Sequence, residues 1–234
     1  MDATPPGTAI RRHSLATRIW HWINALAILV LIGSGLGISN AHPRLYWGRY
    51  GANFDPAWLE LPFFPALLTI PANYNLAMSR RWHLLFALVL GFGLLGYMVA
   101  SLANRHFARD LRVRGEDVAP RHLLDDLRAH LDLRYHDPER PREYNAFQKL
   151  SYVLVIFVAL PLAILTGLTL SPGMNAAWPW LLEMFGGRQS ARSIHFIAAS
   201  GITLFTIVHI ALVFLAGWRN EIRSMVTGWW RVPE

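Results

Sequence analysis

Two histidines, His195 and His209, lie within residues 194–217, an apolar stretch that contains no Asp, Glu, Lys or Arg. A stretch of this length can cross a bilayer, which takes about 20 residues. The two histidines are 14 residues apart. Because that spacing is close to four helical turns, both rings leave the same face of the helix, about 21 Å apart along its axis. Ionisable side chains inside a span are costly and usually functional, so this pattern indicates ligands for two stacked cofactors.

Three further apolar runs must position partners for these rings. The runs predict an all-α integral membrane protein, a four-helix bundle with spans at about 15–38, 82–103, 147–170 and 194–217. The first run holds His21, the second begins with His83, and the third holds no histidine but contains Pro161, which is expected to kink it. We treat residues 1–234 as one membrane domain.

Composition limits the chemistry that these spans can perform. The 234 residues are 53% hydrophobic and include no cysteine, which excludes disulfides, thiolate-bound iron–sulfur clusters and Cys-based zinc or haem attachment. The net charge of +7 is explained by arginines that flank the spans, so no nucleic-acid partner is expected. The basic N-terminal segment continues into the first span without a cleavage site of the A-x-A kind, which predicts a retained anchor.

The placement of Lys and Arg predicts the orientation. Sixteen of the 22 basic residues fall in the N-terminal segment, the connection 104–146 with Lys149, and the C-terminal tail. The positive-inside rule then puts both termini in the cytoplasm of a multi-pass protein of the bacterial inner membrane. The six basic residues on the opposite side are Arg44, Arg49, Arg80, Arg81, Arg188 and Arg192.

In this topology the four intramembrane histidines fall at two levels. His21 lies near the cytoplasmic side at the depth of His209, and His83 lies near the outer side at the depth of His195. The other six histidines fall in predicted tails or loops: His13, His42, His106, His122, His130 and His136.

Paired imidazoles on neighbouring helices suit the two axial positions of a haem iron, and filling both favours electron transfer over oxygen chemistry. A structural zinc ion would need about four ligands, and each level supplies two. The spacing therefore predicts two b-type haems in the bundle core. The alternative is that these histidines form hydrogen bonds that pack the helices together.

Three segments carry a resemblance to a known family. RIWHWINALAILVLIGSG in the first span, RRWHLLFAL at the second and GGRQSARSIHFIAASGITLFTIVHIALVFLAG at the fourth resemble the bacterial four-helix di-haem cytochrome b subunits of formate dehydrogenase, nickel–iron hydrogenase and thiosulfate reductase type. The last motif, followed by EIRSMVTGWW, is most similar to members that accompany periplasmic molybdopterin oxidoreductases. The resemblance implies the ligand pairs His21/His209 and His83/His195. It also implies an outer haem that exchanges electrons with a periplasmic partner and an inner haem that exchanges them with a quinone.

Several polar and small residues near these levels are secondary candidates. Arg81 and Arg192, together with Arg80, lie beside the outer pair, and Arg18 lies beside His21, where they are placed to bind haem propionates or simply to flank the spans at the headgroups. Asn24 is a polar candidate for a quinone pocket. The glycines of the first two spans either leave room for a flat macrocycle or allow close helix packing.

The sequence therefore favours an electron-transfer subunit of an oxidoreductase, working between quinone and a periplasmic oxidoreductase or cytochrome, rather than a catalyst on its own. One alternative is a stand-alone enzyme with the same haems, such as a superoxide:quinone oxidoreductase or a ferric reductase. Another is a transporter or anchor without haem. Outside the spans we expect an interfacial amphipathic segment at 57–70 and a surface helix at 123–136.

Overall fold

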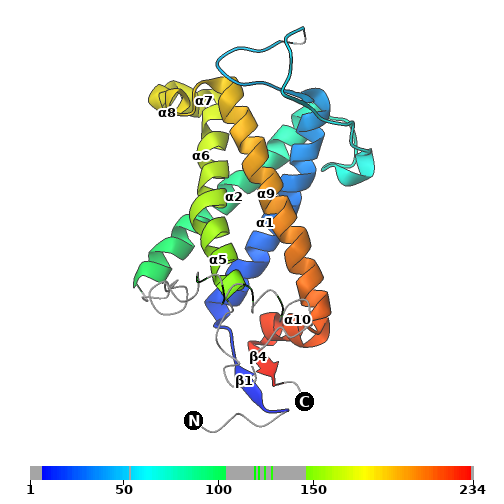
Figure 1. Ribbon diagram of the computed structural model, residues 1–234, viewed down its shortest axis with the longest axis vertical. Helices are drawn as coiled ribbons and strands as arrows, with labels where there is room; N and C mark the ends of the chain where they lie inside the picture. Colours follow the sequence, from blue (N-terminus) through cyan, green and yellow to red (C-terminus); the bar gives the residue numbers. More distant parts are fainter. Residues whose placement is uncertain are drawn as a thin grey trace. The chain divides into compact units, whose positions relative to one another are not determined.

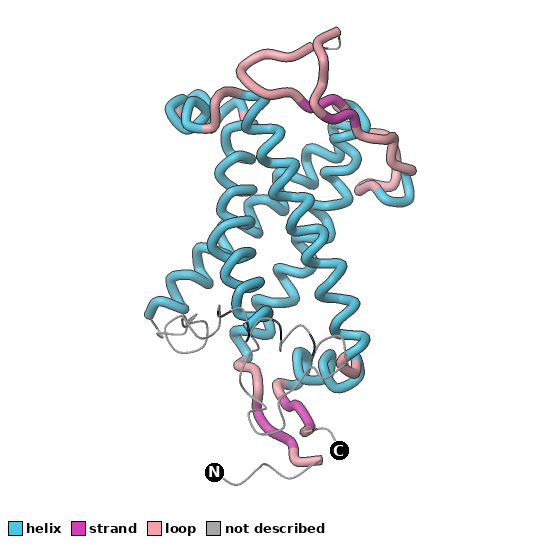
Figure 2. Tube along the Cα trace, viewed as in Figure 1, coloured by secondary structure: helices cyan, strands magenta, loops and turns pink. Residues whose placement is uncertain are grey.

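The computed structural model describes residues 7–52, 54–103 and 146–232, together with the isolated positions 119, 121, 124 and 128. The described part is mostly helical, with two short strand pairs (Figure 1, Figure 2). Its elements, in chain order, are β1 (Ala9–Arg11), α1 (Leu15–Ala41), β2 (Arg44–Leu45), β3 (Leu59–Glu60), the 3-10 helix η1 (Ala66–Leu68), α2 (Leu76–Ala103), α5 (Ala146–Leu154), the π-helical turn η2 (Val155–Ala159), α6 (Leu160–Leu170), α7 (Pro172–Ala177), α8 (Pro179–Met184), α9 (Arg188–Leu215), α10 (Trp218–Thr227) and β4 (Trp229–Arg231).

Among the described residues, four helices are long and apolar enough to cross a membrane: Leu15–Ala41, Leu76–Ala103, Phe147–Leu170 and Arg188–Leu215. Their mean hydropathy lies between 1.9 and 2.6. The prediction of an all-α protein with four membrane-spanning helices is confirmed.

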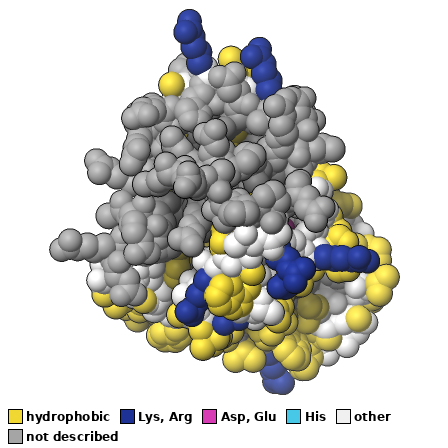
Figure 3. Space-filling model, turned by 90° about the horizontal axis from the view of Figure 1, so that it is seen from below, with side chains coloured by type: hydrophobic (Ala, Val, Ile, Leu, Met, Phe, Trp, Pro, Cys, Tyr) yellow, Lys and Arg dark blue, Asp and Glu magenta, His cyan; other side chains and the backbone are white. Residues whose placement is uncertain are grey.

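Side chains are distributed as a lipid solvent requires. Large apolar side chains such as Phe92 and Leu204 point outward, with 71% and 64% of their surface exposed, and hydrophobic side chains are prominent on the described surface in Figure 3. The residues that are almost wholly buried include many small ones, among them Ala27, Ser34 and Thr166. Lipid does not drive apolar side chains inward, so small residues that let backbones approach take the helix contacts instead.

The helix ends extend beyond the predicted spans. α2 begins at Leu76 rather than residue 82 because the side chain of Asn75 accepts a hydrogen bond from the backbone N–H of Met78 at 3.0 Å and caps the helix. α9 begins at Arg188 rather than residue 194, directly after Gly186 and Gly187, which adopt positive φ values of 76° and 102°. The additional turn of α9 is mostly polar, and that of α2 ends in two arginines, which is why a criterion of hydrophobicity stopped short of both.

The third span is irregular where Pro161 enters it. The π-helical turn Val155–Ala159 directly precedes α6, and Pro161 occupies the first turn of α6. Proline has no N–H to donate to the preceding turn, so the regular hydrogen-bond ladder is interrupted there.

The chain divides into two compact units, and the division crosses the spans. Unit 1 contains residues 1–23, 96–154 and 205–234, and unit 2 contains residues 24–95 and 155–204. Each of the four spans therefore contributes one part to each unit. His21 and His209 belong to unit 1, whereas His83 and His195 belong to unit 2.

In unit 1 the two ends of the chain pair with each other. β1 and β4 form an antiparallel ribbon in which Ile10 lies opposite Trp230 (Figure 1). Trp230 is almost fully buried and donates its indole N–H to the carboxylate of Glu221 on α10 at 2.9 Å. We call this assembly of β1, β4 and α10 the terminal module. Pairing of the two strands brings both ends of the chain to one side, as the prediction of four spans requires.

In unit 2 the connection between α1 and α2 is fastened to the start of α9. Trp58 donates its indole N–H to the hydroxyl of Ser193 at 2.9 Å, and that hydroxyl donates to the carbonyl of Tyr46 at 2.6 Å. The segment expected at 57–70 is not a continuous helix: it contains β3 and the short 3-10 helix η1, because its prolines interrupt regular hydrogen bonding. The surface helix expected at 123–136 lies almost wholly outside the described residues.

The terminal module contains a histidine whose titration couples pH to stability. Burial, with Arg12 acting in the same direction, lowers the pKa of His13 from 6.5 to about 4. The unfolded chain therefore takes up a proton near pH 6.5, whereas the folded module takes it up only near pH 4, so stability falls as the pH is lowered between these values.

We expect the protection of the Ile10 and Trp230 amides against hydrogen exchange, corrected for intrinsic rates, to fall from pH 7 to pH 4.5. A His13→Asn variant, which does not titrate, should show a flatter dependence over the same range. The same slope in both proteins would contradict the role given to His13.

Candidate functional site

The rings of His83 on α2 and His195 on α9 face each other within unit 2. Their centroids are 6.1 Å apart and their planes are inclined by 67°. The two residues are far apart in the sequence, so helix packing alone brings them together. The level matching predicted from the topology is realised for this pair.

Each ring of this pair contacts a hydroxyl residue and the glycine that follows it on a neighbouring helix. These are Ser34 and Gly35 on α1 for His83, and Thr166 and Gly167 on α6 for His195. The Nδ1 atom of His83 lies 3.0 Å from the Ser34 hydroxyl on α1, and a Cβ on Gly35 would meet the same ring at 3.6 Å. The Nδ1 atom of His195 lies 3.1 Å from the Thr166 hydroxyl on α6, and a Cβ on Gly167 would meet this ring at 3.3 Å. The hydroxyls orient the rings, and at Gly167 the missing side chain leaves space for the ring of His195.

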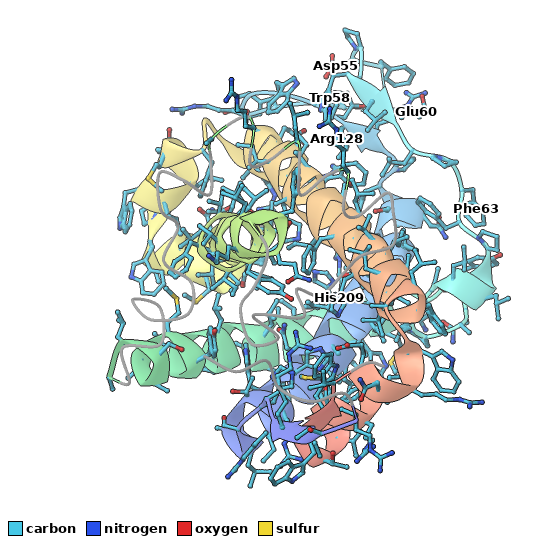
Figure 4. All side chains as sticks on the ribbon, turned by 60° about the horizontal axis from the view of Figure 1, so that its bottom comes forward. Asp55, Trp58, Glu60, Phe63, Arg128 and His209 are labelled. Atoms are coloured by element: carbon cyan, nitrogen blue, oxygen red, sulfur yellow. The ribbon has the colours of Figure 1, made fainter. Side chains whose placement is uncertain are left out.

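The rings of His21 on α1 and His209 on α9 face each other within unit 1. Their centroids are 6.3 Å apart and their planes are inclined by 60°. Phe205 stacks on His209 with centroids 5.8 Å apart, and Trp22 meets the edge of His21 at 5.2 Å. Figure 4 shows His209 on α9, drawn in orange. One helix therefore supplies a histidine to both pairs.

The separation of the rings fits one metal ion in each pair. A first-row metal binds an imidazole nitrogen at about 2 Å and the ring centre lies about 1 Å further out, so two axial imidazoles place their centres about 6 Å apart. The observed 6.1 and 6.3 Å match this distance. No group of three or more His, Cys, Asp or Glu that could hold a metal ion occurs in the described part of the chain, so each pair offers two protein ligands and no more.

Three polar atoms along one stretch of α1 are buried without a hydrogen-bond partner among the described residues. They are Nε of Arg18, Nδ1 of His21 and Oδ1 of Asn24. An unpaired buried polar group costs about 1–3 kcal/mol, and native proteins rarely leave several together. These atoms therefore indicate that α1 faces a polar ligand along this stretch.

The arginines predicted beside the histidines have different surroundings. Arg18 donates to the carbonyl of Val226 at the end of α10. Arg192 donates to the carbonyls of His42 and Arg44 and so ties the α1–α2 connection to α9. Arg81 is exposed on α2, two residues before His83.

Arg80, three residues before His83 on α2, contacts His42. Its guanidinium is 3.2 Å from Nε2 of His42. Burial, reinforced by Arg192 and Arg80, lowers the pKa of His42 below its ordinary value, so this ring stays neutral between two cations.

An apolar cleft of about 330 Å³ lies in unit 1 between the start of α1 and the end of α10. Trp22 and Arg18 of α1 bridge it by donating to the carbonyls of Met225 and Val226, the first at 3.1 Å. The lining residues are Leu15, Arg18, Ile19, Trp22, Ile23, Met225 and Val226. His21 lies on the same turns of α1 but is not among the lining residues.

The sequence did not single out Ser34, Thr166, Gly167 or the cleft. A hydroxyl residue followed by glycine is a weak signal, since Ser200–Gly201 has the same form and a Cβ on Gly201 would meet nothing within 4 Å. Among the glycines of the first span, Gly33 and Gly37 pack against Ile70 and Ser79, which is ordinary close packing.

Comparison with known proteins identifies the family. Residues 12–228 match the family model described as prokaryotic cytochrome b561. The chain belongs to the prokaryotic cytochrome b561 family. The resemblance to bacterial b-type cytochrome membrane subunits is therefore confirmed, and with it a haem-binding helical membrane protein that transports electrons.

Relatives of this cytochrome b561 family member extend over most of its length. A putative protein-methionine-sulfoxide reductase subunit, YedZ1, of Azospira oryzae is 29% identical over 208 residues, which cover 85% of this chain and 87% of the relative. A probable Ni/Fe-hydrogenase B-type cytochrome subunit of Cupriavidus necator is 24% identical and the match covers 91% of this chain and 83% of the relative. A protein of the same description from Azotobacter vinelandii is also 24% identical, with 95% and 88% covered. No solved structure matches the chain.

Membership of this family establishes haem b as a cofactor. Together with the four apolar helices, it makes the chain a multi-pass bacterial membrane protein. The two histidine pairs are the residues whose chemistry and spacing fit this cofactor.

The contact between Gly167 and His195 provides a test of the site. A Gly167→Val substitution places methyl groups where the ring lies, because even its Cβ would be 3.3 Å from the imidazole. We expect a lower haem b content per chain, measured as the pyridine haemochrome. Gly201→Val on α9 is the matched control, since a Cβ there meets nothing within 4 Å. Equal haem content in both variants would contradict a cofactor role for His195.

Proposed function

We propose that this chain is a di-haem subunit that carries electrons across the bacterial inner membrane, between the quinone pool and a periplasmic redox partner. The observation that supports this most strongly is the presence of two imidazole pairs, each about 6 Å apart and each within its own compact unit. The pairs His21/His209 and His83/His195 are the proposed axial ligands of two haems b. Residues 1–234 then form one membrane cytochrome b domain.

Haem would supply a one-electron couple when bound. The four histidines would hold the two groups, and a site held by two imidazoles would favour electron transfer over oxygen chemistry. Arg18, Arg81 and Arg192 are the proposed partners of the haem propionates. Of these, Arg18 has the strongest support, since its buried Nε has no partner among the described residues.

The orientation rests on charge. Most Lys and Arg lie at the side that holds both termini, which makes that side cytoplasmic under the positive-inside rule. The His21–His209 pair then belongs to the inner haem and the His83–His195 pair to the outer haem.

The cleft between the start of α1 and the end of α10 is the proposed quinone site. Its lining is almost wholly apolar, as a quinone ring and tail require, with Arg18 as the one charged residue that lines it. Its position at the end of α10 keeps it on the cytoplasmic side in the proposed orientation. Asn24, whose buried side-chain oxygen has no partner among the described residues, is a second polar candidate on the same helix.

The partner is proposed to be an oxidoreductase on the periplasmic side. The similar proteins carry the names of hydrogenase and methionine-sulfoxide reductase subunits, which supports this class of partner. The resemblance of the fourth-span motif favours a molybdopterin-dependent enzyme.

The ligand assignment is tested by removing one histidine from each pair. We expect His209→Ala to lose mainly the inner haem and with it reduction by quinol. His195→Ala should lose mainly the outer haem and keep reduction of the remaining haem by quinol. Haem content is measured as pyridine haemochrome, and His106→Ala, outside the four spans, is the control. Unchanged haem content in both span variants would refute the assignment.

The quinone site is tested by filling the cleft. Ile19 lines it on the exposed side of α1, so Ile19→Trp should occupy the space without touching a histidine. The expected result is slower haem reduction by a quinol analogue, with haem content and reduction by dithionite unchanged. Wild-type quinol kinetics in this variant would exclude the cleft as the site.

A further inference from the structure

The hydrogen bonds at His195 determine which of its ring nitrogens carries the proton. Nδ1 of His195 lies 2.9 Å from the backbone carbonyl of Ala163. A carbonyl oxygen can only accept, so Nδ1 must be the donor. The Thr166 hydroxyl donates its proton to the carbonyl of Leu162 at 2.6 Å. Its oxygen can therefore act as a second acceptor for the Nδ1–H of His195, at 3.1 Å. Nε2 is therefore the unprotonated nitrogen that can bind a metal.

The same arrangement occurs at His83 on the opposite side of the pair. The Ser34 hydroxyl donates to the carbonyl of Val30 at 2.6 Å and lies 3.0 Å from Nδ1 of His83. Since its proton is already used by Val30, the hydroxyl accepts from Nδ1–H. Ser34 and Thr166 are both fully buried, with 0% of their surface exposed, so water does not compete for either bond.

In the His21–His209 pair, His21 lacks such a hydrogen bond at Nδ1 among the described residues. Nδ1 of His21 is buried and has no hydrogen-bond partner in the part of the chain that the structure describes. The ring of His21 is instead held by its edge contact with Trp22. The two cofactor positions are thus electronically unequal.

We propose that Ser34 and Thr166 are positioning residues that lower the midpoint potential of the haem bound by His83 and His195. Ser34 accepts the Nδ1–H of His83, and Thr166 shares the Nδ1–H of His195 with the carbonyl of Ala163. This inference rests on the proposed function. A histidine that donates its second N–H to a fixed acceptor is a stronger base toward the metal. A stronger axial donor stabilises ferric over ferrous iron, which is one of the protein's means of setting a haem potential.

A purely structural role for these hydroxyls makes a different prediction. Buried Ser and Thr also hold transmembrane helices together, and in that case any buried hydroxyl of α6 would have a comparable effect. Thr169 provides the comparison, because it is equally buried on the same helix but its hydroxyl donates to the carbonyl of Thr166 rather than contacting a histidine.

The experiment is an optical redox titration of the purified full-length cytochrome with Ser34→Ala, Thr166→Val and the control Thr169→Val. In wild type we expect two titrating haem components. In Ser34→Ala and in Thr166→Val the component of the His83–His195 haem should move to a higher potential, while the other component stays in place. Thr166→Ser, which restores the acceptor, should return the wild-type value, and Thr169→Val should not shift. Repeating the titrations in a His209→Ala background isolates the haem concerned.

Unchanged potentials in Ser34→Ala and Thr166→Val, with both haems bound, would overturn the proposal. An equal shift in Thr169→Val would also overturn it in favour of simple packing. Ser34→Ala affects His83 and Thr166→Val affects His195. If one variant loses haem, the potential measured in the other still tests the proposal. A wild-type protein without two titrating components would instead contradict the proposed function itself.

Discussion

The structure depends on pairs of half-buried imidazole rings that meet between helices in an apolar environment, with ring centroids 6.1 and 6.3 Å apart. Each ring carries two nitrogens that need partners, and lipid supplies none. Where Nδ1 is satisfied, as at His83 and His195, a hydroxyl or carbonyl of a neighbouring helix does so. The ring centroids lie at a separation that suits one metal ion between the rings. A bound haem would thus complete the helix packing as well as supply the redox chemistry, which links folding to cofactor loading.

One helix organises both positions. α9 contributes His195 to unit 2 and His209 to unit 1, and the 14-residue spacing keeps both rings on one face. Its start is fixed by Ser193, which holds the indole of Trp58 and the backbone of Tyr46. The α1–α2 connection and the terminal module therefore hold the ends of helices whose paired histidines lie further inside.

The sequence was sufficient for the features that hydrophobicity and spacing control. Four spans, the four histidines within them and the pairing by depth all follow from apolar runs and from the alternation of direction. The first turns of α2 and α9 were missed because Asn75 and Gly187 define them by capping and backbone conformation, not by hydropathy. The β1–β4 ribbon was also missed, since three-residue strands formed by the two chain ends have no local signature.

The hydrogen-bond acceptors of His83 and His195 could not be predicted from the sequence for a related reason. Ser34 and Thr166 act on histidines 49 and 29 residues away, so only the helix packing reveals the contacts. Ser200 also precedes a glycine but makes no hydrogen bond to a histidine in the described part of the chain, and its neighbouring sequence does not distinguish it from Ser34 and Thr166. Only the packing of the helices shows which hydroxyls contact a histidine.

The most direct test of the central claim is the number and coordination of haems in the purified full-length protein. Haem b per polypeptide should be measured together with the electron paramagnetic resonance spectrum of the oxidised state. Two haems per chain, both low-spin with two axial imidazoles, are predicted. A colourless protein, a single haem or a high-spin iron would contradict the claim that both histidine pairs hold haem.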